Sequence, residues 1–144
     1  MRQEGRQMRW KRVIYCSRST VSLENSLNLA ELLGASARNN RRDEITGLLA
    51  YAEGMFIQAI EGTPPAVDRL MDRLRADTRH RDLTVLGEDF GSQRAFAVWA
   101  METPKMRPER TALLRNLVER CGGSYGSALK LMLDMAQDFD TASA

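Results

Sequence analysis

Cysteine and histidine are scarce in this 144-residue chain, which has two cysteines and one histidine. Neither cysteine has the spacing of a metal ligand, so we expect no disulfide framework and no metal site. A single histidine, with no glycine-rich phosphate loop and no paired-histidine motif, leaves no recognisable catalytic set. The sequence therefore predicts a protein that is not an enzyme.

Long apolar runs are also missing. No segment has the length of a transmembrane helix and the N-terminus lacks a signal-peptide pattern, so we expect no membrane partner, a cytoplasmic location and reduced thiols. A net charge of +2 is too small to indicate a nucleic-acid partner. A hydrophobic fraction of 43% is enough for one core, and the length suits one domain.

Against this background, Gln58 is the most informative residue, because it interrupts the apolar segment 55–60. A buried carboxamide that lacks a partner costs about 1–3 kcal/mol. Backbone groups of the core could satisfy the amide, and so could a neighbouring side chain or a ligand. The choice depends on whether other polar groups converge on it.

Two further elements offer such groups. Asn28 and Glu31 have capping-box spacing and predict a helix over residues 28–38, whose apolar stripe continues onto Ser36 and Asn40. Tyr15 lies in a predicted strand over residues 9–16, with its phenol on an inward face. Asn40 also suits an ordinary helix end and Tyr15 also suits simple packing, but together with Gln58 they predict a pocket lined by one phenol and two carboxamides.

The remaining pattern predicts a ferredoxin-like α+β sandwich, with two helices on one face of a mixed five-stranded sheet. After the first strand and helix, we expect a hairpin with its turn at Glu53-Gly54 and a helix that opens at Thr63 with two prolines in its first turn. Two more strands are predicted over residues 83–86 and 96–101.

The tail forms a separate unit in this prediction. Two amphipathic stretches flank Gly122-Gly123 and predict a C-terminal helical pair that covers the open face of the sheet. The pair can be a structural lid, a relay to a partner, or both. We expect a flexible extension over residues 1–8, the main domain over 9–104 and the helical extension over 105–144.

Taken together, several segments resemble the BLUF domains, blue-light sensors that use a flavin. The resemblance covers about residues 12–103, and its most specific parts are the Phe-x-Gln-x-x-Glu-Gly segment at 56–62 and the Trp-x-Met pair of Trp99 and Met101. Its segments are residues 13–18, 37–40, 45–49, 56–62, 77–80 and 94–101.

The resemblance implies a flavin cofactor, with FAD preferred and FMN or riboflavin as alternatives, held between the two helices. In this scheme Gln58 bridges Tyr15 and the flavin, Arg79 and His80 lie near the ring or its tail, and Ser36 supports the network. The implied cofactor-binding residues are Ser36, Asn39, Asn40, Gln58, Arg79 and His80.

The resemblance also implies a mechanism. Tyr15 is the electron and proton donor after blue-light excitation, and Gln58 rotates or tautomerises, which shifts the flavin absorption to the red. Trp99 and Met101 share one face of the last strand and would relay this change to the tail, although core packing also explains them. The implied partners are a downstream signalling protein of unknown identity and further copies of the chain.

A second class stays open from the residues alone. The same fold serves flavin-free ligand-binding modules and acylphosphatase-like hydrolases. Retention of Tyr15, Asn40 and Gln58 favours the flavin sensor, because a pocket without a ligand has no use for three buried polar groups.

Overall fold

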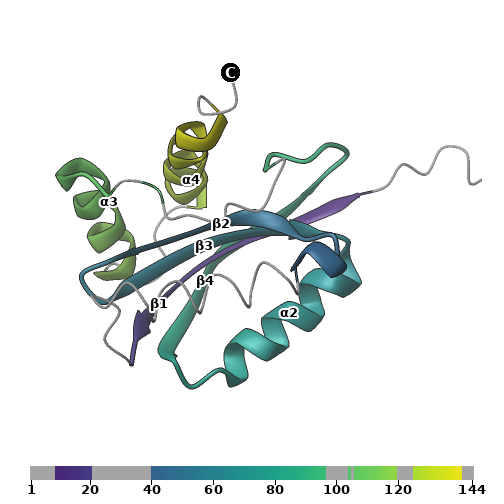
Figure 1. Cartoon of the computed structure of the whole chain (residues 1–144), viewed down its shortest axis with the longest axis horizontal. Coiled ribbons are helices and arrows are strands. Elements are labelled where there is room, and N and C mark those ends of the chain that lie inside the picture. The colour runs from purple at the N-terminus through teal and green to yellow at the C-terminus, as the bar shows by residue number, and fades with distance from the viewer. Residues whose placement is uncertain (1–8, 21–39, 97–103, 105, 120–124, 141–144) are drawn as a thin grey trace, which may run out of the picture.

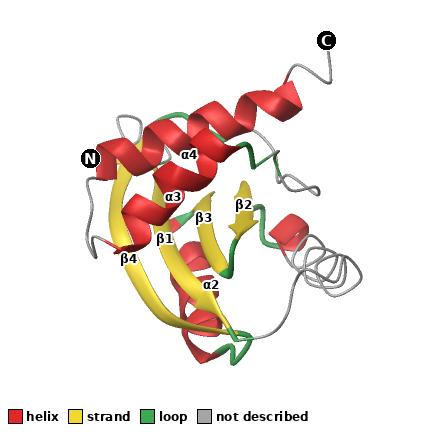
Figure 2. Cartoon of the chain, turned by 90° about the vertical axis from the view of Figure 1, so that its left-hand side faces the viewer, coloured by secondary structure: helices red, strands yellow, loops and turns green. Residues whose placement is uncertain are grey.

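The computed structural model describes residues 9–20, 40–96, 104, 106–119 and 125–140. A single antiparallel sheet lies between α2 on one face and α3 with α4 on the other (Figures 1 and 2). The elements are β1 (Trp10–Ser19), β2 (Thr46–Ala52), β3 (Met55–Gly62), α2 (Pro64–Ala76), β4 (His80–Gly91), α3 (Pro108–Glu119) and α4 (Tyr125–Asp140).

The sheet order is β2-β3-β1-β4, and every neighbouring pair is antiparallel. The prediction of a mixed five-stranded sheet is therefore wrong for the described residues, which form four strands. The crossover through α2 explains part of this pattern: it leads from β3 to β4, which lies on the other side of β1, so β1 lies between two antiparallel neighbours. Of the predicted strand over 96–101, Phe96 lies outside any strand, and the other residues are not described.

β4 is much longer than the predicted strand over 83–86. Among the described strands it lies at the edge and pairs only with β1, so its charged residues reach solvent while its backbone continues the ladder. The alternation of apolar residues that marks a half-buried strand is correspondingly weak at its ends. The predicted helix over 28–38 lies outside the described residues. The first described residues after it, 40–42, are helical.

Local turn chemistry follows the sequence closely. Glu53 and Gly54 both have positive φ, 52° and 78°, as a two-residue hairpin turn between β2 and β3 requires. α2 begins after Thr63, with Pro64 and Pro65 in its first turn, where the missing N–H groups have no helical partner. Gly47 sits so close to β3 that a Cβ would lie 1.9 Å from the Ala59 carbonyl oxygen.

Strand alternation divides the core between the two faces. Val13, Tyr15 and Ile60 pack with the buried residues of α2, whereas Ile14 and Ile57 point the other way and pack with α3 and α4. The apolar helix residues buried in the core of the second face are Leu114, Leu117, Ala128, Leu131, Met132 and Met135. Among the described residues, no helix is both long and apolar enough to cross a membrane.

Candidate functional site

Tyr15 and Gln58 face each other across the two central strands, on the face that α2 covers. They are register partners on β1 and β3, and the Tyr15 hydroxyl donates a hydrogen bond to Gln58 Oε1. Both side chains are buried, with 2% and 4% of their surface exposed. Because the amide oxygen accepts from the phenol, Gln58 has its NH₂ group, with two donor hydrogens, to offer on its other side.

Asn40 brings an unpaired acceptor into the same pocket. Its side chain is 1% exposed, and Asn40 Oδ1 has no hydrogen-bond partner among the described residues. The backbone is fixed, because Ile45 N donates to the Asn40 carbonyl at 2.8 Å. An unsatisfied buried acceptor costs about 1–3 kcal/mol, so this oxygen is placed to receive a hydrogen bond from a ligand.

The pocket combines apolar walls with this polar edge. Leu49, Phe56, Leu70 and Leu74 supply the apolar side. The polar lining consists of Tyr15, Asn40, Gln58, Asp77, Arg79 and His80. Apolar walls with a few convergent amide groups suit a planar heteroaromatic ring whose edge carries N–H and carbonyl groups, which describes a flavin.

His80 lines the pocket, but its ring nitrogens are both bonded within the protein. Nε2 lies 2.6 Å from the Leu74 carbonyl oxygen and therefore carries the hydrogen, and Nδ1 lies 2.7 Å from Ser17 Oγ. The ring is edge-on to Tyr15, with centroids 6.0 Å apart. In this arrangement His80 packs against the phenol and has no ring nitrogen left for a cofactor.

Ser17 is a buried site residue that the sequence reasoning missed. Its side chain is 2% exposed and bonds to His80 beside Tyr15. The sequence could have indicated that Ser17 lies beside Tyr15, because strand residues two apart share a face.

Arg79 and Asp77 form an ion pair at the pocket edge. Arg79 Nη2 lies 2.6 Å from Asp77 Oδ2, and the bond lowers the pKa of Asp77 and raises the pKa of Arg79. Arg79 therefore lines the pocket with its charge already matched. Asp77 also lines the pocket, which the sequence did not lead us to expect, and its negative charge acts on Tyr15.

The phenol of Tyr15 is held in its neutral form. Burial raises its pKa far above the ordinary value near 10, and the charge of Asp77 adds to the effect. Tyr15 therefore keeps its proton at neutral pH and acts as a hydrogen-bond donor to Gln58.

Four predicted site residues cannot be placed. Ser36, Asn39, Trp99 and Met101 lie outside the described residues. Their assignments as cofactor contacts or relay residues stay predictions.

Comparisons with known proteins agree on the family. A family model described as "BLUF: Sensors of blue-light using FAD" matches residues 10–102. Photoactivated adenylate cyclase subunit beta of Euglena gracilis is 34% identical over 97 residues, which are 67% of this chain and 11% of that protein. The chain thus spans about a tenth of the length of this curated relative.

Solved structures show the same fold. BlrB, a BLUF protein in its dark state, superimposes with a TM-score of 0.72 and 27% identity, over 92% of this chain and 98% of that chain. A bacterial light-regulated adenylyl cyclase gives a TM-score of 0.63 and 31% identity, over 77% of this chain and 34% of that chain. Since the family model covers most of the sequence, the chain belongs to the BLUF family of blue-light sensors.

Proposed function

We propose that this chain binds FAD in the pocket beside α2 and switches by rearranging the hydrogen bonds of Gln58. The supporting observation is the buried bond from Tyr15 to Gln58 beside the unpaired oxygen of Asn40. We choose FAD because the family description names it, with FMN or riboflavin as the alternatives. Asn40 and Gln58 would hold the ring edge, while Leu49 and Leu70 would pack on it.

The chemistry that a bound flavin supplies is strong one-electron oxidation after blue-light absorption. Tyr15 is positioned to supply the electron, because its phenol lines the pocket. Its proton would pass along the existing hydrogen bond to Gln58 Oε1, since a phenol that has lost an electron is strongly acidic. Return of the electron and the proton to Tyr15 would restore the starting state, so the cycle would have no net consumption.

Gln58 is the part of the protein that stays changed. Rotation or tautomerisation of its amide reverses which groups donate and accept, and both forms keep the side chain within the same buried space. The persistent result is a new hydrogen-bond pattern around the pocket, which shows as a red shift of the absorption spectrum. The switch needs no covalent bond to a cysteine.

The first experiment measures colour and photochemistry. We expect the purified protein to be yellow, to release FAD on denaturation as identified by mass, and to shift its absorption to the red under blue light. Tyr15→Phe and Gln58→Leu should keep the flavin and lose the red shift. Tyr125→Phe is the matched control, because Tyr125 lies on the opposite sheet face, and it should shift normally.

Three outcomes would contradict the proposal. A colourless protein that does not take up added FAD would favour a flavin-free ligand-binding module. Release of phosphate from an acyl phosphate in darkness would favour a hydrolase. A normal red shift in Tyr15→Phe would remove the phenol from the mechanism.

We propose that the output passes through residues 97–103 and the C-terminal helices to a downstream signalling protein or to further copies of this chain. The matched region would act as a sensor without turnover, since it corresponds to only 11% of the cyclase relative. Size-exclusion chromatography in darkness and under blue light tests the assembly. An identical elution volume in both conditions would contradict light-dependent assembly.

A further inference from the structure

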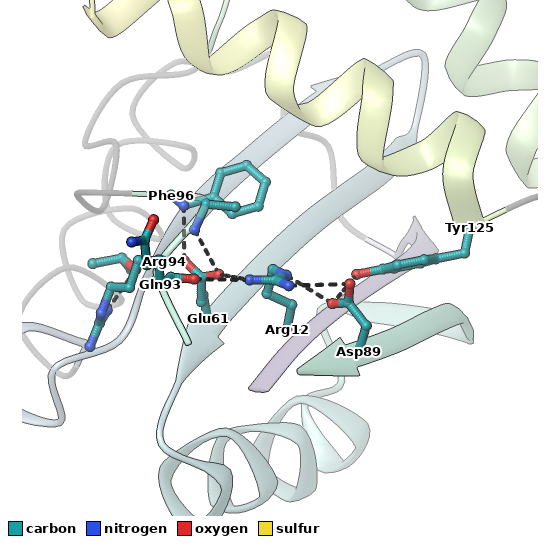
Figure 3. Close-up of polar contacts among 9 residues, drawn as sticks. Arg12, Glu61, Asp89, Gln93, Arg94, Phe96 and Tyr125 are labelled. Atoms are coloured by element: carbon teal, nitrogen blue, oxygen red, sulfur yellow. Dashed lines mark hydrogen bonds and ion pairs between the residues drawn. The ribbon is translucent and has the colours of Figure 1, made fainter. Parts of the chain in front are cut away.

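Three charged residues form a row across the sheet on the face opposite to Tyr15. Arg12 on β1 is the register partner of Glu61 on β3 and of Asp89 on β4. Arg12 Nη1 lies 2.9 Å from Glu61 Oε2, and Arg12 Nε lies 2.8 Å from Asp89 Oδ1 (Figure 3). The Glu61 side chain is fully buried, so these partners offset the cost of burying a carboxylate.

One end of this row holds the chain that follows β4. The carboxylate of Glu61 accepts hydrogen bonds from the backbone N–H groups of Ala95 and Phe96, both at 2.9 Å. Arg12 also donates to the Gln93 carbonyl at 3.2 Å. The Phe96 side chain is 3% exposed in the core beneath α3 and α4. Residues 93–96 are therefore tied to the row immediately before the stretch that contains Trp99.

A second set of contacts, made by Arg94, holds the same segment against the start of β2. Arg94 donates to Thr46 Oγ1 and to the Glu44 carbonyl, each at 2.7 Å, and its guanidinium lies 3.9 Å from the centre of the Trp10 ring. Since both sides of the segment are bonded, a shift of its backbone must move these partners or break their bonds.

The other end of the row holds α4. Tyr125, the first residue of α4, donates its hydroxyl to Asp89 Oδ1 at 2.8 Å (Figure 3). Its ring lies directly on Gly87, where an added Cβ would come within 2.6 Å of the Tyr125 ring. The Tyr125 side chain thus joins the start of α4 both to the row and to the backbone of β4.

We propose that the row of Glu61, Arg12 and Asp89 passes a light-induced displacement of residues 93–96 to α4, with Tyr125 as the positioning residue. This inference rests on the proposed function, in which the signal leaves through the segment after β4. β3 links the pocket to the row, since Gln58 and Glu61 lie three residues apart on opposite faces of this fully buried strand. A shift at the pocket and a shift at the row therefore share the same backbone.

The test compares hydrogen–deuterium exchange of α4 in darkness and under blue light, in the full flavin-loaded chain. Wild type should show a red shift and a light-minus-dark exchange difference over residues 125–140. Tyr125→Phe should keep the red shift and lose that difference, because the bond to Asp89 is gone. Arg115→Gln is the control: it breaks the ion pair between α3 and Glu53, outside the row, and should keep both signals.

The outcomes separate the two proposals. If wild type shows no red shift, the proposed function fails and this inference falls with it. If wild type shows the red shift but Tyr125→Phe keeps the full exchange difference, the row is only structural and this inference alone is overturned. A structural bond would raise exchange equally in darkness and in light, which leaves the difference unchanged. Asp89→Leu removes the acceptor of the Tyr125 hydroxyl and should also abolish the light-minus-dark exchange difference.

Discussion

The two faces of the sheet differ in whether a buried polar side chain has all its hydrogen-bond partners within the described residues. On the α2 face, Asn40 keeps a buried oxygen with no partner among the described residues. On the α3 and α4 face, both oxygens of the buried Glu61 are hydrogen-bonded, to Arg12 and to two backbone N–H groups. The difference indicates that the first face is arranged for a ligand and the second for fixed positions of the chain.

The same strand supplies both faces. β3 places Gln58 in the pocket and Glu61 in the row, because strand side chains alternate. A change of polar residue should therefore have different consequences on each side: loss of stability on the row side, and loss of ligand binding on the pocket side.

The largest effect should come from the row. Glu61→Ala leaves Arg12 and two backbone N–H groups without their buried acceptor, and we expect a loss of about 3–5 kcal/mol in the free energy of unfolding. Urea denaturation measures it. The matched control is Glu88→Ala, because Glu88 is half-exposed and 3.7 Å from Lys11, and it should cost about 1 kcal/mol or less. Equal losses in the two variants would contradict the distinction.

The contact between Tyr125 and Gly87 sharpens the same comparison. Gly87→Ala forces the Tyr125 ring to move, and we expect it to destabilise the protein by about 1–3 kcal/mol. In a Tyr125→Ala background the added methyl group meets no ring, so most of that cost should vanish in a double-mutant cycle measured by urea denaturation. If the free-energy losses of Gly87→Ala and Tyr125→Ala simply add in the double variant, the cost of Gly87→Ala does not come from the Tyr125 ring.

The pocket face should respond through binding. Asn40→Ala removes an acceptor that no described residue pairs with, so we expect flavin affinity to fall about tenfold, the value of one hydrogen bond. The unfolding free energy of the flavin-free protein should change by about 1 kcal/mol or less. Fluorescence titration with FAD gives the Kd, and Asn116→Ala on the exposed side of α3 is the control. A large loss of stability without loss of affinity would reverse our assignment of Asn40.

The smallest effect is a pH dependence. Burial raises the pKa of Tyr15, whereas an unfolded tyrosine ionises near pH 10. Its contribution to stability is fully present below about pH 10 and is lost as the pH rises toward the folded-state pKa, because the unfolded state then binds fewer protons. Above about pH 10, the unfolding free energy of flavin-free wild type should fall more steeply than that of Tyr15→Phe, by at most about 1.4 kcal/mol per pH unit. Parallel slopes would contradict the burial effect.

Several site features could be predicted from local sequence. Tyr15 and Gln58 each interrupt or end an apolar strand segment, so their inward orientation followed from alternation. The hairpin turn at Glu53-Gly54 and the start of α2 followed from turn and capping chemistry. These features depend on residues that are close in sequence, which is why they could be recognised without a structure.

Other features depend on strand register and could not be predicted. The row joins Arg12 to Glu61 and Asp89 over 49 and 77 residues of sequence, and no local pattern specifies such pairs. The length of β4 was missed because an edge strand exposes charged residues that interrupt the apolar pattern. The bond of His80 to Ser17, which leaves the imidazole no free nitrogen, depends on the turn from α2 into β4.

The sequence by itself determined the order of the described helices and strands, the faces that their side chains occupy and the family, because backbone geometry converts residue spacing directly into direction. The tertiary structure decided which polar groups meet. It brought Tyr15 to Gln58, left Asn40 Oδ1 with no partner in the described part of the chain and aligned Glu61 with Arg12 and Asp89. Burial and register act between distant segments, and only the folded chain fixes them together.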